Sequence, residues 1–142
     1  MNVKRFLIVL AFVFVAVMLS AVKSNAVPDV TASGDESFER VSVETLGEAF
    51  RSNPYRAKKT YQGKNLEVRG KVGSFGSKNN EPVIRFYYNG VTVNCCISEN
   101  DPLIADVTKG ENTTIRGYVS EIAPLDVMEA YKLISCKIIS AN

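Results

Sequence analysis

A short alternating segment with a central glycine occurs twice in the chain and constrains the fold more than any other feature. In residues 61–72, Leu66, Val68 and Val72 alternate with polar side chains, as in a strand with one buried face. Gly70 shares their inward phase, where a residue without a side chain lets a strand bend. Residues 114–119 repeat the pattern, with Ile115, Gly117 and Val119 in phase. Two bent strands of this kind predict a small closed barrel.

The dipeptide Asn89-Gly90 predicts a tight hairpin in the middle of the chain. Both residues tolerate positive φ, which favours a two-residue type I′ turn between a strand over 83–88 and the strand that follows. This turn would pair Tyr88 with Val91, Phe86 with Val93 and Ile84 with Cys95 on the inner face. The outer face would then present Arg85, Tyr87, Thr92, Asn94 and Cys96.

Other segments complete the expected elements. Helix caps at Ser42 and Asn53 predict two helices before the first strand, the second reaching about Tyr61. The polar segment 75–82 is expected to be a loop, and 103–107 a short helix. Two further strands are expected over 113–122 and 131–139, the latter with Ile134, Cys136 and Ile138 in one phase.

Five strands, a hairpin between the second and third and a helix between the third and fourth match the five-stranded Greek-key barrel called the OB-fold, here preceded by an N-terminal helical segment. The chain is therefore expected to be mainly β with helices. Over residues 41–139 it resembles the tRNA-anti-like family of exported bacterial OB-fold proteins. The resemblance rests on Leu46, Asn53, Ala57, Tyr61, Gly63-Lys64, Val68, Gly70, Val72, Cys95, Lys109-Gly110, Gly117 and Cys136. It implies a small secreted or membrane-tethered module with no catalytic set.

The first residues predict export. Lys4-Arg5, an apolar run and the small residues Ser24 and Ala26 are typical of a signal peptide over 1–26. A flexible leader over 27–40 and the OB-fold domain over 41–142 would follow, placing the domain in the periplasm or outside the cell. The alternative is an uncleaved membrane anchor over 6–22. No cysteine lies directly after the apolar run, where lipoproteins carry their lipid-bearing cysteine.

The charge of the chain gives no general argument for nucleic-acid binding. Removal of residues 1–26 takes away three of the 17 basic residues and none of the 15 acidic ones, which leaves a net charge of −1. A local argument remains, because segment 51–78 holds eight basic residues and a single acidic one, Glu67. Such a run is more often a solvated face than a binding site. Stacking on bases would rest on Tyr87 with Tyr118, which is a poor platform.

No residue pattern indicates catalysis. The chain has no histidine, which removes the commonest general base and metal ligand. No cofactor and no metal ion are expected. OB-folds bind ligands on the outer face of the second and third strands, flanked by the loops after the first and fourth strands. The candidate contacts are Lys78, Arg85, Tyr87, Thr92 and Asn94, although ordinary solvated strand residues would look the same.

The three cysteines predict one bridge in an oxidising compartment. Cys95 and Cys136 share the inward phase of strands that are neighbours in an OB-fold, whereas Cys96 points outward. A Cys95 to Cys136 disulfide is therefore expected, the alternative being two small buried thiols. Together these features predict an exported, non-catalytic module that binds a protein or an envelope glycan. The alternative is a nucleic-acid-binding domain that uses segment 51–78.

Overall fold

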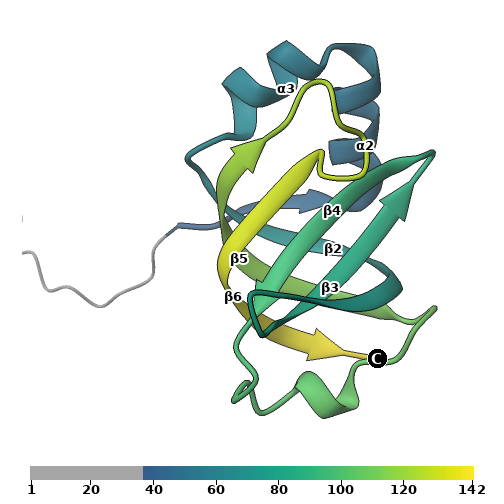
Figure 1. Ribbon diagram of the computed structural model, residues 1–142, viewed down its shortest axis with the longest axis vertical. Helices are drawn as coiled ribbons and strands as arrows, with labels where there is room; N and C mark the ends of the chain where they lie inside the picture. The colour runs from purple at the N-terminus through teal and green to yellow at the C-terminus, as the bar shows by residue number, and fades with distance from the viewer. Residues whose placement is uncertain (1–36) are drawn as a thin grey trace, which may run out of the picture. The chain divides into compact units, whose positions relative to one another are not determined.

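The computed structural model describes residues 37–142, in which five strands close a barrel (Figure 1). The strands follow one another round the barrel in the order β2-β3-β4-β6-β5, and pairing of β2 with β5 closes it. Only the β4–β6 pair of the barrel is parallel. This is the predicted OB-fold strand order. The bounds are β2 Asn65–Lys78, β3 Glu81–Tyr88, β4 Val91–Ile97, β5 Asn112–Ile122 and β6 Tyr131–Ala141.

The expected signal peptide over 1–26 lies outside the described residues, as does the leader up to residue 36. Within 37–142, no helix has the length and apolar character needed to cross a membrane.

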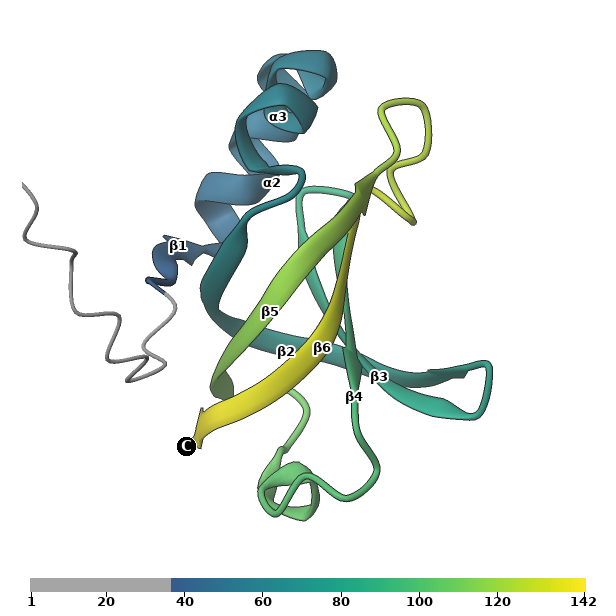
Figure 2. The ribbon, with the colours of Figure 1, turned by 90° about the vertical axis from the view of Figure 1, so that its left-hand side faces the viewer.

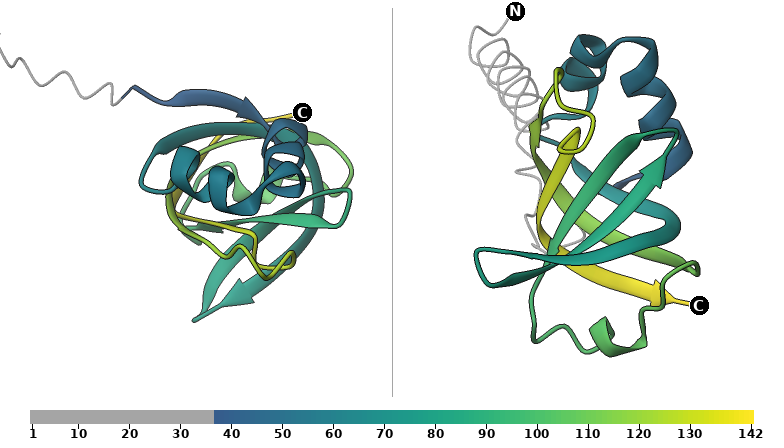
Figure 3. Two further views of the ribbon diagram at one scale, coloured as in Figure 1. Left: turned by 90° about the horizontal axis from the view of Figure 1, so that it is seen from above. Right: turned by 45° about the vertical axis from the view of Figure 1, so that its right-hand side comes forward.

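Two helices cover one end of the barrel, as the view from above shows (Figure 3). They are α2 Val43–Ser52 and α3 Pro54–Tyr61. Both predicted caps are confirmed: Ser42 Oγ accepts a hydrogen bond from Thr45 N, and Asn53 Oδ1 accepts one from Arg56 N. The apolar side of α2 places Leu46 and Phe50 in the core of the barrel.

A short strand that was not predicted from the sequence, β1 Glu39–Ser42, pairs in parallel with β2 through Leu66–Arg69. Its first two residues, Glu39 and Arg40, were assigned to the leader. The strand forms because β2 bends. The first half of β2 pairs with β5, and the second half pairs with β3. One edge of Leu66–Arg69 therefore still has backbone N–H and C=O groups that need hydrogen-bond partners.

The expected loop over 75–82 is wrong. Strands β2 and β3 continue through this segment as a hairpin that projects from the barrel (Figure 2), and only Asn79 and Asn80 form the turn. Their φ values of 53° and 65° are positive, and asparagine tolerates a positive φ better than most residues with a side chain. Polar residues can form this ladder because strands that extend beyond the barrel have no core to face.

The β3–β4 hairpin has the predicted register, with Ile84 opposite Cys95 and Arg85 opposite Asn94. The phase predicted for the last strand is only partly right, because β6 contains a bulge. Ser135 adopts a φ of 52°, and two residues of β6 lie opposite Cys96. The extra residue turns Ile134 toward solvent and brings Cys136 into the core.

The expected helix over 103–107 is a single 3-10 turn, Ile104–Asp106. The buried carboxylate of Asp101 determines the path of the chain here. One oxygen accepts a hydrogen bond from Leu103 N, and the other accepts one from Ile138 N in β6. The connection is thereby tied to the barrel without a longer helix.

Candidate ligand face of the barrel

Two side chains on the outer face of β3, Arg85 and Tyr87, lie across glycines of the neighbouring strand. A Cβ atom at Gly73 would collide with the ring of Tyr87, and one at Gly76 would collide with the guanidinium of Arg85. The Tyr87 hydroxyl also shares a hydrogen bond of 2.7 Å with Ser74 Oγ. The bulge in β2 between Val72 and Ser74 lies at the same place. The backbone of β2 therefore leaves room for both side chains to lie along the surface.

Arg85 is half-buried and held at several points. Its Nε donates to Asn94 Oδ1 at 3.2 Å, and its Nη1 lies 3.5 Å from the backbone oxygen of Phe75. Within residues 37–142 no carboxylate forms an ion pair with it. A fixed guanidinium without a carboxylate partner is suited to bind an acidic group of a ligand, because its planar fork matches a carboxylate.

The expectation that Thr92 and Asn94 face solvent is wrong. Their exposed fractions are 0% and 5%, because the loop 123–130 between β5 and β6 lies over them. Thr92 N donates to Val127 O at 2.9 Å, and Asn94 Nδ2 donates to Met128 O at 3.1 Å. These two residues therefore hold the loop in place, and Asn94 also orients Arg85.

Lys78 lies at the end of the β2–β3 hairpin, where its Nζ is 3.5 Å from Glu129 Oε2 of the loop 123–130. This exposed ion pair links the two loops beside the outer face of β3. Exposed pairs contribute little to stability, about 0–1 kcal/mol. Lys78 can therefore exchange Glu129 for an acidic ligand at small cost. We call Lys78, Arg85, Tyr87 and Ser74 the ligand face.

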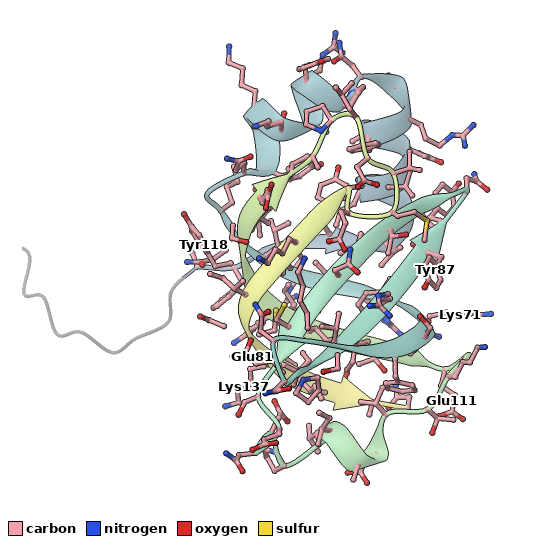
Figure 4. All side chains as sticks on the ribbon, viewed as in Figure 1. Lys71, Glu81, Tyr87, Glu111, Tyr118 and Lys137 are labelled. Carbon is pink, nitrogen blue, oxygen red and sulfur yellow. The ribbon has the colours of Figure 1, made fainter. Side chains whose placement is uncertain are left out.

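Tyr118 does not belong to this face. It lies on β5, on the other side of the barrel from Tyr87 (Figure 4). The exposed fractions of the two side chains are nearly equal, 42% for Tyr118 and 43% for Tyr87. The two rings cannot stack on neighbouring bases of one strand. The aromatic platform considered from the sequence is therefore absent from the described residues.

The eight basic residues of segment 51–78 are spread over several elements. Arg51 lies in the last turn of α2. Arg56, Lys58 and Lys59 lie on α3, and Lys64, Arg69, Lys71 and Lys78 lie before or on β2. Lys64 pairs with Glu39 at 2.9 Å, and Lys78 pairs with Glu129. The run in the sequence is therefore not one continuous groove along the barrel.

The three cysteines gather where β4 meets β6. A hydrogen bond with Cys136, together with burial, raises the pKa of the Cys95 thiol well above its usual value. Cys136 in turn lies over Gly117, where a Cβ atom would collide with its sulfur. Cys96 is buried on the opposite face of β4, and burial raises its pKa. All three are free thiols in this structure, so the expected disulfide between Cys95 and Cys136 stays a prediction.

A hollow of about 590 Å³ lies at the end of the barrel away from the helices, between the β2–β3 turn, the end of β4 and the bulge of β6. Cys96, Cys136, Glu81 and Glu99 are among the residues that line it. No group of three or more His, Cys, Asp or Glu side chains in residues 37–142 could hold a metal ion.

The residues that position the ligand face were not predicted from the sequence. Gly73 and Gly76 make room for it, Ser74 binds Tyr87, and Met128 O anchors Asn94. One signal was present. Gly73 and Gly76 lie three residues apart in a polar segment, and the next strand has an outward Arg and Tyr. This combination could have indicated close contact between the two strands.

The solved structures that are similar to the chain have low sequence identity to it. A protein of Klebsiella pneumoniae, named as a candidate nucleic acid-binding lipoprotein, is 18% identical, with 73% of this chain and 93% of that chain covered and a TM-score of 0.57. Two further structures have lower TM-scores. An OBody bound to hen egg-white lysozyme is 14% identical, with 63% of this chain and 90% of that chain covered and a TM-score of 0.41. The telomere capping protein Ten1 of S. pombe is 14% identical, with 72% of this chain and 81% of that chain covered and a TM-score of 0.42.

No curated protein matches the sequence. The tRNA_anti-like family, in contrast, matches residues 1–130, which is most of the 142-residue chain. No catalytic family is indicated. The strand order, the two capped helices and this match lead to one conclusion: the chain belongs to the tRNA_anti-like family of OB-fold domains.

Proposed function

We propose that the protein is an exported, non-catalytic OB-fold module that binds a protein or an envelope glycan through its ligand face. The observation that carries the proposal is the arrangement of Arg85 and Tyr87, which are held along the surface by Gly76 and Gly73. The signal-like residues 1–26 support export.

The contacts of the ligand face favour a ligand with a carboxylate beside an apolar or sugar ring surface. Arg85 and Lys78 supply positive charge, and Tyr87 supplies an exposed ring. Aromatic rings and arginine side chains dominate the energy of many protein interfaces. A ring held by Ser74 and an arginine held by Asn94 lose little conformational freedom on binding, which favours affinity.

The test is recovery of partners from envelope extract on immobilised protein. The variant Arg85→Ala, Tyr87→Ala removes the two central side chains. The control Arg69→Ala, Tyr118→Ala removes an exposed arginine and a tyrosine of equal exposure elsewhere on the barrel. We expect the first variant to lose partners that the wild type and the control retain. Equal recovery by all three would exclude the ligand face.

Treatment of the extract with protease separates the two classes of partner. Material that is still captured after digestion would be a glycan, and material that disappears would be a protein. Thermal unfolding of each variant is measured alongside, so that a lost partner is not confused with a lost fold.

The alternative, nucleic-acid binding through segment 51–78, predicts binding that weakens steeply with salt as counterions are released from phosphates. Titration of single-stranded RNA and DNA at low salt tests it. Absence of binding there would end the alternative and would leave the ligand-face proposal unaffected.

A further inference from the structure

We propose that the end of the barrel covered by the helices docks on an anionic lipid bilayer. The surface consists of four exposed apolar side chains and four basic ones, and we call it the helical-end surface. Its members are Tyr55, Leu125, Val127, Met128, Arg51, Arg56, Lys58 and Lys59. None of its members belongs to the ligand face, although the loop 123–130 that carries three of them also borders that face through Glu129 and Met128. Neither proposal requires the other.

The helices and the loop 123–130 lie at the same end of the molecule (Figures 1 and 3). Hydrogen bonds confirm this placement. Ile122 N, at the end of β5, donates to Gln62 Oε1 just after α3, and the Tyr131 hydroxyl at the start of β6 donates to Leu46 O in α2. Arg51 Nη1 donates to Asn89 O in the turn beside this loop.

The loop presents its apolar side chains to solvent on a fixed backbone. Leu125 is 90% exposed and Met128 58% exposed. Asp126 Oδ1 accepts hydrogen bonds from Met128 N and Glu129 N, while Thr92 N and Asn94 Nδ2 bind the backbone oxygens of Val127 and Met128. A loop held in this way cannot fold its aliphatic side chains inward. Protruding aliphatic side chains of this kind gain free energy by entering the interfacial region of a bilayer.

The charge of the neighbouring helix is complementary to an anionic surface. Between Glu48 and Glu67 the chain has five basic residues and no acidic one, and α3 carries three of them, Arg56, Lys58 and Lys59. Each basic side chain near an anionic bilayer contributes about 1 kcal/mol. The exposed ring of Tyr55 on the same helix is of the type that settles at a membrane interface.

Three acidic residues near this end are engaged in contacts within the protein. Glu48 accepts a hydrogen bond from the Tyr88 hydroxyl, Glu129 pairs with Lys78, and Asp126 binds backbone N–H groups of its own loop. These three carboxylates are therefore already engaged, and α3 itself carries no acidic residue.

A bilayer fits this surface better than a nucleic acid does. Binding of single strands relies on aromatic rings on which bases stack. The loop instead presents leucine, valine and methionine, and Tyr55 is the one aromatic ring of the helical-end surface. Aliphatic side chains beside basic ones are the combination found where proteins lie on anionic membranes.

The absence of tryptophan from the sequence allows a site-specific test. Leu125→Trp places a fluorescent reporter on the loop, and Ile139→Trp places one near the C-terminus at the other end of the barrel (Figure 1). We call these the loop reporter and the distal reporter. Protein is recovered from cells, and its N-terminus is determined by mass spectrometry. It is then mixed with vesicles of phosphatidylcholine alone or with vesicles in which roughly one lipid in three is phosphatidylglycerol, because basic segments are attracted to anionic lipids.

We expect the emission of the loop reporter to move to shorter wavelength with the anionic vesicles and that of the distal reporter to stay unchanged. In the Leu125→Trp background, Arg56→Glu, Lys58→Glu and Lys59→Glu together should raise the half-saturating lipid concentration at least ~10-fold. The control triple Lys71→Glu, Lys109→Glu, Lys137→Glu makes the same charge change away from this surface. It should raise the half-saturating lipid concentration less than ~3-fold.

Three results would overturn the proposal. They are an unchanged spectrum of the loop reporter with anionic vesicles, equal shifts of the two reporters, and equal effects of the two triple reversals. A single-stranded RNA that shifts the emission of the loop reporter without lipid and prevents the vesicle-induced shift would also overturn it, and would assign the helical-end surface to nucleic acid.

Discussion

The hydroxyl of Tyr131 donates a hydrogen bond of 2.8 Å to the backbone oxygen of Leu46, and so ties the start of β6 to α2 inside the core. The same ring packs against Phe50 and Tyr61, with centroid distances of 5.8 and 6.4 Å. Through Tyr131 the helices and the barrel share one core. Burial raises the pKa of this phenol well above its ordinary value of about 10.

Tyr131→Phe should therefore change both stability and its dependence on pH. At neutral pH we expect a loss of about 1 kcal/mol, the typical net value of one hydrogen bond. Because the folded state holds the proton more tightly than the unfolded state, Tyr131 contributes stability that is fully present below about pH 10 and is lost as the pH rises further. Urea unfolding at about pH 8 and about pH 11, on either side of the ordinary tyrosine pKa, measures both effects. An equal decline in wild type and variant would contradict the assignment.

The Cys95 and Cys136 thiols are expected to form a disulfide in protein recovered after export. They already lie in contact, and closing a loop of about 40 residues would add ~3–4 kcal/mol through the entropy of the unfolded chain. Mass mapping of the unreduced protein should find this pair and an alkylatable Cys96 once the protein is unfolded. Three free thiols, or a link from Cys96 to Cys136, would contradict the prediction.

Ser135→Gly should stabilise the protein by ~0.5–1 kcal/mol. Ser135 has a φ of 52°, a conformation that costs energy for a residue with a Cβ atom and little for glycine. The control Ser140→Gly changes a serine of the same strand whose φ is not positive, and it should destabilise the protein. The urea midpoints of both variants test this, and a loss of stability in Ser135→Gly would show that the bulge is not strained.

The N-terminus of the exported protein is predicted to be Val27, because Ser24 and Ala26 provide the small residues that signal peptidase requires. N-terminal sequencing of protein from outside the cytoplasm checks it. A chain that still begins near Met1 and is recovered with membranes would favour the anchor over 6–22.

Local signals in the sequence were sufficient for most of the barrel. The caps at Ser42 and Asn53 and the Asn89-Gly90 turn act over a few residues, so each could be recognised without knowing its surroundings. The strand order then followed from the OB-fold pattern.

Features that depend on distant contacts could not be predicted. Strand β1 forms because the bend in β2 leaves an edge open, and the bulge at Ser135 has no local sequence signal. Thr92 and Asn94 alternate with core residues as exposed positions do. They are buried because a loop from a distant part of the chain lies over them, and nothing within β4 encodes that contact.

The most direct test of the ligand face is photo-crosslinking in cells that export the protein. A benzoylphenylalanine at position 87 reports on this face, and the same residue at position 118 is a control of equal exposure on the other side of the barrel. The proposed function predicts discrete adducts of higher mass from position 87 that are absent from position 118. No adduct from position 87, or the same adducts from both positions, would contradict it.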